Sequence, residues 1–235
     1  MTQTLTDSLD KHHIALPKVQ VRKLEAYCQL LWNWNDRINL TRHTNYEKFV
    51  ARDIVDSLAL AGFLRTGERI LDVGTGGGVP GIPLAILRPD LRVELCDSTG
   101  KKALAVSEML QDLRLNIPVH HAKAEMLLLE KGNRFTTLTI RAVSRMTMLL
   151  RQFAPCWSSF DRVLLVKGPK WIEERGEARH HNLMTKIALR CLKTYATNIS
   201  ESENAESVIL QLCLKEHFDK LNKIIDKHSG TTARH

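Results

Sequence analysis

The sequence lacks the patterns that would indicate disulfide bonds or a metal centre. Its 235 residues contain only five cysteines, an odd number with no Cys-x-x-Cys pair. Three pairs of adjacent histidines occur, but none recurs with cysteine or another partner at the spacing of metal ligands. We therefore expect reduced and mostly buried thiols, and we assign no metal ligands.

Long apolar runs are also missing. No segment approaches the length of a membrane span, and the first seven residues lack the basic region that precedes the apolar part of a secretory signal. Hydrophobic residues make up 43% and charged residues 26% of the chain, a balance typical of folded globular proteins. We expect a soluble cytoplasmic protein with no membrane partner.

Acidic residues are outnumbered by basic ones, 26 against 34, which gives a formal net charge of +8. Such an excess attracts polyanions over a long range, so it favours nucleic acid as a partner. Many enzymes carry a mild positive charge without binding nucleic acid. The charge therefore supports an RNA or DNA partner without establishing one.

Apolar residues three or four positions apart predict two helices, over residues 18–38 and 46–63. From Gly67 onward, short apolar strands alternate with helices, the pattern of an α/β protein with a parallel sheet. We therefore expect a helical extension at 1–66 and a Rossmann-like domain at 67–235. Strands are expected at 69–73, 92–96, 119–122, 137–141 and 162–167, with helices at 80–87, 101–115, 145–156 and 171–185.

Two β-rich runs, at residues 188–197 and 207–215, predict a terminal hairpin and hence an antiparallel last strand. A polar tail is expected from His228 onward.

A glycine-rich turn, Asp72-Val73-Gly74-Thr75-Gly76-Gly77-Gly78, follows the first expected strand. Gly76, Gly78 and Gly81 also match the pattern of dinucleotide-binding folds, which is weak evidence when it stands alone. The turn could bind a dinucleotide or S-adenosylmethionine, and Asp72 distinguishes these two ligands. A carboxylate there would oppose the pyrophosphate of a dinucleotide but attract the ammonium and sulfonium of S-adenosylmethionine. Asp97 ends the next strand and can accept hydrogen bonds from a ribose, which both ligands contain. A sharp turn that only starts a helix, without a ligand, is the alternative interpretation, which the two carboxylates disfavour.

Together with this turn, several further motifs resemble the RsmG (GidB) family of small-subunit ribosomal RNA guanine-N7 methyltransferases. They align in order and spacing over roughly residues 20 to 170. The matching segments are Trp34-Asn35, Ile38–Thr41, Arg52–Leu58, Leu71–Leu84, Asp97-Ser98, Gly100–Lys102, Ala124-Glu125, Arg141–Val143 and Lys167-Gly168.

The resemblance implies a class I S-adenosylmethionine methyltransferase fold, with a seven-stranded, mostly parallel sheet and an antiparallel last strand. It also implies that S-adenosylmethionine is the cofactor, with Ala124 and Glu125 at the adenine and Arg141 at the mouth of the methyl-transfer pocket. With the turn, the expected cofactor residues are Asp72, Gly74, Gly76, Gly78, Val79, Asp97, Ala124, Glu125 and Arg141.

The implied substrate is 16S ribosomal RNA or the small ribosomal subunit, with guanosine 527 of the 530 loop as the family target. We expect a monomer, since a large substrate must reach the pocket. The candidate substrate residues are Asn39, Asp56, Ser57, Lys101, Arg141 and Lys167. For Asn39 and Asp56, a helix cap and a solvated helix residue are equally good interpretations. Further basic residues that could contact phosphate are Lys102, Lys170, Arg175 and Arg179.

Two positions depart from the family pattern. Asp53 stands where histidine is usual, and Arg145 replaces a small residue or proline. If Asp53 touches RNA, the substrate contact would differ.

Guanine N7 needs no general base, because its in-plane lone pair can attack the methyl group directly. A dinucleotide-dependent oxidoreductase and a non-catalytic RNA-binding protein remain the alternatives.

Overall fold

In the computed structural model, the structure describes residues 3–130, 134–141, 144–198 and 204–229. A seven-stranded sheet forms the centre of this part, in the order β3-β2-β1-β4-β5-β7-β6. The strands are β1 (Arg69–Val73), β2 (Arg92–Asp97), β3 (Val119–His121), β4 (Phe135–Arg141), β5 (Phe160–Lys167), β6 (Ile187–Asn198) and β7 (Asn204–Leu214).

The first five strands pair in parallel, whereas β7 is antiparallel to both β5 and β6. The predicted antiparallel last strand is therefore confirmed, as is the helical region that precedes the sheet. The boundary between a helical extension and a Rossmann-like domain at residue 66 stays a prediction.

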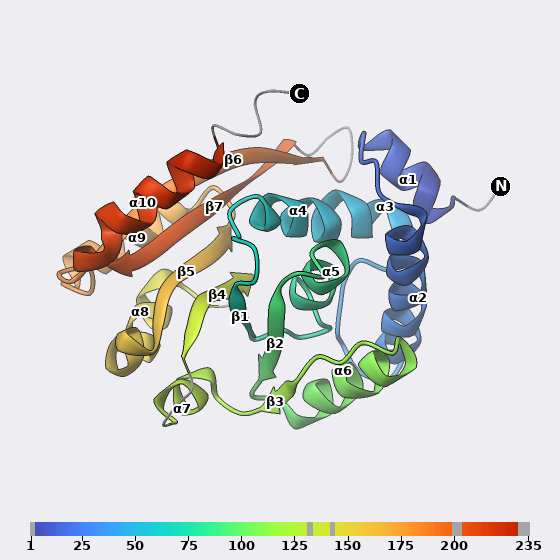
Figure 1. Ribbon diagram of the computed structural model, residues 1–235, viewed down its shortest axis with the longest axis horizontal. Coiled ribbons are helices and arrows are strands. Elements are labelled where there is room, and N and C mark those ends of the chain that lie inside the picture. The colour runs from blue at the N-terminus through green and yellow to red at the C-terminus, as the bar shows by residue number, and fades with distance from the viewer. Residues whose placement is uncertain (1–2, 131–133, 142–143, 199–203, 230–235) are drawn as a thin grey trace.

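Helices cover both faces of the sheet (Figure 1). They are α1 (Leu5–Lys11), α2 (Lys18–Asn35), α3 (Tyr46–Lys48), η1 (Phe49–Ile54), α4 (Val55–Ala61), α5 (Gly81–Leu87), α6 (Gly100–Asp112), α7 (Ala124–Leu129), α8 (Met146–Phe153), η2 (Ala154–Ser159), α9 (Trp171–His180) and α10 (Lys215–Ser229).

Alternate residues of the central strands face opposite layers of the core. In β5, Leu164 and Val166 belong to the cluster that includes α2, α4, α5 and α6, whereas Val163 and Leu165 belong to the cluster with α7, α8 and α9. This two-residue period is the geometry of an extended strand. Because both faces are covered, the parallel strands are apolar on both sides.

The order of the strands reverses between β1 and β4. From β1 the chain moves outward through β2 and β3, then returns to the other side of β1 for β4 and β5. In open α/β sheets, ligands bind beyond the carboxyl ends of the strands at such a point. The glycine-rich turn follows β1 and Arg141 ends β4, so both lie at this crevice.

Most predicted elements are present, with ends that shift by a few residues, but three helices were missed. Neither α1 nor α7 was predicted. Of α10, Lys215 was assigned to the last β-rich run, residues 216–227 to no element and the rest to a polar tail. Helix α7 has six residues, too few for a periodic pattern to be recognised. The predicted helix at 46–63 contains the π-helical stretch η1, which its apolar spacing did not reveal.

A buried ion pair lies at the opposite, amino end of the strands. Arg162 of β5 donates through Nη2 to both carboxylate oxygens of Glu68, at 3.1 and 3.2 Å, and to the carbonyl of Phe63. Thr137 of β4 bridges the pair, since its hydroxyl donates to Glu68 and accepts from Arg162 Nε. Both charged side chains are almost fully buried. Glu68 also pairs with Arg65 at 3.1 Å, whereas Glu68 is the carboxylate that compensates the charge of Arg162.

Replacing Glu68 by glutamine should therefore lower the free energy of unfolding by about 3 to 5 kcal/mol, because it leaves the Arg162 charge buried without a partner. Urea denaturation at neutral pH measures this loss. The matched control is Asp90→Asn, which breaks the partly exposed pair with Arg88 and should cost about 1 kcal/mol or less. Equal losses in the two variants would contradict the account.

Candidate active site

The glycine-rich turn connects β1 to α5 and has a backbone that glycine alone adopts easily. Gly74, Gly76 and Gly78 have φ angles of 66°, 60° and 100°. A Cβ on Gly81 would lie 2.1 Å from Leu95 and 2.8 Å from the carboxylate of Asp72. The glycines therefore allow both the path of the turn and its close packing on the sheet.

Asp72 supports this turn from behind. Its fully buried carboxylate accepts hydrogen bonds from the Thr75 hydroxyl at 2.6 Å, from the Gly81 amide at 3.0 Å and from the Thr139 hydroxyl at 3.0 Å. Both carboxylate oxygens therefore accept hydrogen bonds from within the protein. The attraction of a cationic ligand to Asp72 stays a prediction.

The front of the turn opens on a cavity of about 570 Å³, here called the turn cavity. Among its walls are five residues predicted to bind the cofactor: Gly74, Gly76, Val79, Asp97 and Arg141. Asp97 accepts from the amide of Gly76 at 2.9 Å and from that of Thr99 at 2.8 Å, which fixes its carboxylate at the end of β2. Gly78 does not line the cavity.

A second cavity of about 350 Å³, the α7 cavity, adjoins the first and shares Gly74 and Ser98 with it. It is lined by the predicted pair Ala124 and Glu125 at the start of α7. Glu125 accepts a hydrogen bond of 2.7 Å from Gln152 of α8. The two cavities together form a continuous site along the ends of β1 and β2.

The polar cavity, of about 670 Å³, adjoins the turn cavity and shares Arg141 and the segment Leu40–Arg42 with it. Its walls come from the loop after α2, from η1, α4, β4, β5 and β7, and from the residue after β5. They are Asn39, Leu40, Thr41, Arg42, His43, Arg52, Asp56, Arg141, Val166, Lys167, Gly168 and Ser207. Three predicted substrate residues, Asn39, Asp56 and Lys167, are thus brought together here with Arg141.

Two other predicted substrate residues lie elsewhere. Ser57 is fully buried, and its hydroxyl donates to the Asp53 carbonyl at 2.6 Å, so it supports the helix rather than a cavity wall. Lys101 is exposed and lines none of the three cavities, whereas its neighbour Lys102 lines the turn cavity. Lys167 is held by Glu174 at 2.7 Å and by the Ser144 carbonyl at 2.9 Å.

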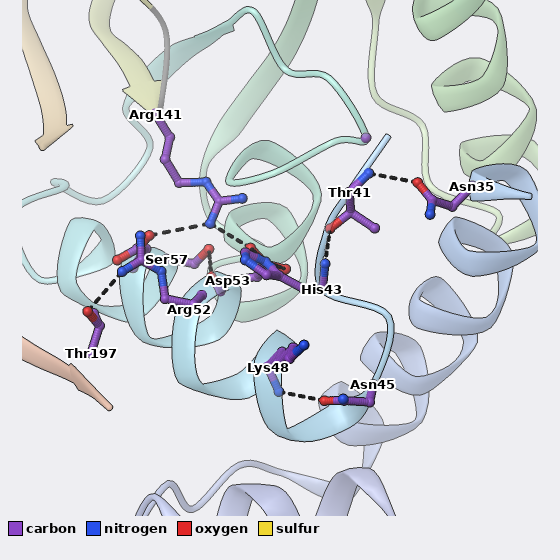
Figure 2. A network of polar contacts seen from close by, with 12 residues as sticks. Asn35, Thr41, His43, Asn45, Lys48, Arg52, Asp53, Ser57, Arg141 and Thr197 are labelled. Carbon is purple, nitrogen blue, oxygen red and sulfur yellow. Dashed lines mark hydrogen bonds and ion pairs between the residues drawn. The ribbon is translucent and has the colours of Figure 1, made fainter. Parts of the chain in front are cut away.

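Arg141 is held between two carboxylates of the preceding helical region. Its Nη1 lies 2.5 Å from Asp53 and 3.3 Å from Asp56 (Figure 2). Burial alone would lower the pKa of Arg141, but the two carboxylates outweigh it and hold the pKa above its ordinary value. The guanidinium is therefore a permanent charge at the boundary between the turn cavity and the polar cavity.

Asp53 is a buried partner of Arg141, not a surface residue. It also contacts His43, whose Nδ1 lies 3.0 Å from both carboxylate oxygens. Asp53, at the position where the resemblance led us to expect histidine, therefore contacts Arg141 and His43. Asp56 is fully buried too, so the interpretation as a solvated helix residue is wrong.

Sequence reasoning also missed two contributors to the site. The hydroxyl of Tyr27 on α2 donates to the carbonyl of Gly77 at 2.7 Å, which ties the helical region to the glycine-rich turn. The π-helical stretch η1 carries Arg52 and Asp53, and such stretches often occur at functional sites. Apolar periodicity reveals neither feature.

His120 of β3 contacts the neighbouring strand, where its Nε2 lies 2.8 Å from Glu94. Across the residues that the structure describes, no cluster of three metal-ligating side chains was found, and none of the helices is long and apolar enough to cross a membrane.

Asp72 should make the stability of the protein depend on pH. Burial raises the pKa of its carboxyl from 3.8 to about 6, although hydrogen bonds from Thr75, Thr139 and Gly81 lower it. Because the folded state then holds this proton more tightly than the unfolded chain, the contribution to stability is present at acid pH and falls as the pH rises through 6.

Between pH 4.5 and 7, the free energy of unfolding should fall by about 2 kcal/mol because the folded protein loses the proton of Asp72. In Asp72→Asn this contribution to the pH dependence should be absent. Urea denaturation of both proteins at both pH values checks the prediction. Asp112→Asn, at an exposed position at the end of α6, is the control and should follow the wild type. Parallel pH dependences in wild type and Asp72→Asn would refute it.

Comparisons with known proteins agree with this architecture. The chain matches the family model GidB, rRNA small subunit methyltransferase G, over residues 20–203. It is 45% identical over 205 residues to the ribosomal RNA small subunit methyltransferase G of Rhodopirellula baltica, covering 85% of this chain and 88% of that protein. The protein of the same name from Desulfitobacterium hafniense is 32% identical, with 84% and 83% covered.

Solved structures with a similar fold include a Pyrococcus abyssi tRNA (uracil-54, C5)-methyltransferase in complex with S-adenosyl-L-homocysteine. It has 14% identity and a TM-score of 0.53, over 74% of this chain and 39% of that one. TrmK of M. capricolum, also in complex with S-adenosylhomocysteine, has 15% identity and a TM-score of 0.51, over 66% of each chain. At these identities the likeness concerns the fold alone.

The fold, the site and the relatives therefore lead to one conclusion. The class I methyltransferase fold predicted from the motifs is confirmed, and the dinucleotide-dependent oxidoreductase is excluded. The chain belongs to the rRNA small subunit methyltransferase G family and is an S-adenosylmethionine-dependent methyltransferase.

Proposed function

We propose that this protein transfers a methyl group from S-adenosylmethionine to N7 of a guanine in 16S ribosomal RNA. The observation that carries the proposal is the place of Arg141, which lines both the turn cavity and the polar cavity. A methyl donor on one side of this residue and a guanine on the other would meet beside its guanidinium.

The turn cavity and the α7 cavity have the chemistry that the cofactor requires. Gly74 and Gly76 bring a backbone without side chains to the cavity wall. Asp97 uses each carboxylate oxygen for one amide, and each oxygen can accept a further hydrogen bond from a ribose hydroxyl. Ala124 and Glu125 would hold the adenine in the α7 cavity. When bound, the cofactor supplies an electrophilic methyl group.

The polar cavity has the chemistry that a nucleotide requires. Arg42 and Arg52 bring positive charge to its walls, which suits a phosphate, whereas the charge of Lys167 is compensated by Glu174. N7 of a paired guanine lies in the deep and narrow major groove of an RNA helix, where side chains cannot reach it. We therefore infer an unpaired guanosine as the target.

Because a folded RNA must approach this face, we also infer that the protein acts as a monomer. We infer that it acts in the cytoplasm.

Arg141 would orient the base. Its ion pairs with Asp53 and Asp56 use Nη1, so Nη2 is placed to donate to guanine O6 while N7 stays open to the methyl group. Such alignment can supply about 7 to 11 kcal/mol of the barrier in favourable cases.

The two carboxylates also suit the charge change of the reaction. The guanine becomes positive as it accepts the methyl group, and a nearby uncompensated cation would oppose this. Asp53 and Asp56 place two negative charges against the single positive charge of Arg141. The site can therefore hold an arginine beside the base without repelling the product.

Arg141→Ala should lower kcat for methyl transfer by about 100-fold or more, because it removes an interaction that orients the reacting base. The Kd for S-adenosylmethionine, measured by calorimetry, should change by less than about threefold. Arg92→Ala, at an exposed position at the far end of β2, is the control and should behave as the wild type. Unchanged kcat in Arg141→Ala would contradict the role given to this arginine.

Methyl incorporation tests the reaction itself. Purified 16S RNA and assembled 30S subunits are incubated with radiolabelled S-adenosylmethionine, and the product is mapped by borohydride and aniline cleavage. We expect one N7-methylated guanine in at least one of the two substrates. RNA binding with no incorporation in either would instead support a non-catalytic RNA-binding protein.

A further inference from the structure

Asp56 has a second partner that reaches it from the far end of the chain. The hydroxyl of Tyr195 on β6 donates to Asp56 Oδ1 at 2.7 Å, while Asp56 Oδ2 faces Arg141 at 3.3 Å. The carboxylate is fully buried, so these donors decide where it lies. Tyr195 does not line the polar cavity and would act on the reaction only through Asp56.

A β-bulge in β6 directs Tyr195 to this face of the sheet. Cys191 pairs with Leu210 and Lys193 pairs with Ile209, so Leu192 is an extra residue without a partner in the ladder. Before the bulge, Leu189 packs on the layer of α7, α8 and α9, whereas after it Tyr195 packs on the layer that contains α4. Because side chains alternate along a strand, one extra residue exchanges the two faces.

Neighbouring contacts hold this arrangement. Arg52, one helical turn before Asp56, donates to Thr197 of the same strand β6 at 2.9 Å. Figure 2 shows Arg52 reaching toward Thr197 while Arg141 points to Asp53. The strand is therefore attached to the helical region at two points, which are two residues apart on β6 and one helical turn apart on the helical region.

We propose that Tyr195 is a positioning residue for methyl transfer, which holds Asp56 and thereby the guanidinium of Arg141 against the target base. This inference rests on the proposed function and assigns to β6 a part in the chemistry. The bulge is the feature of the fold that makes the contact possible.

Loss of the Tyr195 hydroxyl should change how kcat depends on pH, through the protonation of Asp56. The groups that face Asp56 are Arg141 on β4, Tyr195 on β6, and Arg52 and Asp53 on the preceding turn. Burial raises the pKa of Asp56, while Arg141, the Tyr195 hydroxyl and Arg52 lower it. Removing the hydroxyl should raise this pKa further, so Asp56 would take up a proton and release Arg141 at a higher pH than in the wild type.

The test is Tyr195→Phe, with Tyr46→Phe as the matched control. Tyr46 lies on α3, packs at a tilt of 58° against Trp32 and lines none of the three cavities. For each protein, kcat and KM are measured on the RNA substrate from pH 5.5 to 9. The value of kcat is divided by the concentration of sites that bind S-adenosylmethionine, which calorimetry gives. Thermal unfolding is followed in parallel.

We expect kcat of Tyr195→Phe at neutral pH to fall roughly 10-fold, with the Kd for S-adenosylmethionine unchanged within twofold. The acidic limb of kcat should move to higher pH, so that activity recovers as the pH rises. Tyr46→Phe should match the wild type in all of these.

An unchanged kcat together with an unchanged acidic limb would overturn the proposal. A uniform loss of kcat at every pH, or a lower thermal midpoint with normal kcat per binding site, would also overturn it, because either indicates a structural role. If the wild type itself forms no N7-methylguanine, the proposed function fails instead, so the two failures are distinguishable.

Discussion

The pairing of Arg141 with Asp53 and Asp56 connects the two parts of the molecule that build the site. A buried guanidinium is costly unless carboxylates compensate it, and here both carboxylates come from the helices that precede the sheet. Removal of those helices would leave the charge at the end of β4 without partners. The walls of the polar cavity come from the helical region and from the sheet, and the contact between Arg141 and the two carboxylates holds these walls together.

The glycine-rich turn meets a similar constraint at the end of β1. Its backbone stays open toward the cavity because Asp72 holds it from within the sheet and Tyr27 holds it from α2. The charged and polar groups that a ligand would meet, Asp97 and Arg141, are each fixed by contacts inside the protein. A site arranged in this way loses little conformational entropy when a ligand binds.

Local patterns predicted the central strands and the turn, since short apolar runs and glycine spacing depend on neighbouring residues alone. The place of Arg141 followed from a family motif at a strand end. The direction of Asp72 could not be predicted, because it depends on Thr139 from another strand. The role of Tyr195 depends on a bulge in β6 that pairing alone reveals, and the burial of Ser57 depends on how α4 packs.

The account places a methyl donor and a guanine on the two sides of Arg141. The measurement that tests this most directly is a crystal structure with S-adenosylhomocysteine and guanosine 5′-monophosphate bound together. We predict that the guanine occupies the polar cavity, with O6 within hydrogen-bond distance of Arg141 and N7 directed at the sulfur. A nucleotide bound elsewhere, or a sulfur that faces away from Arg141, would contradict the account.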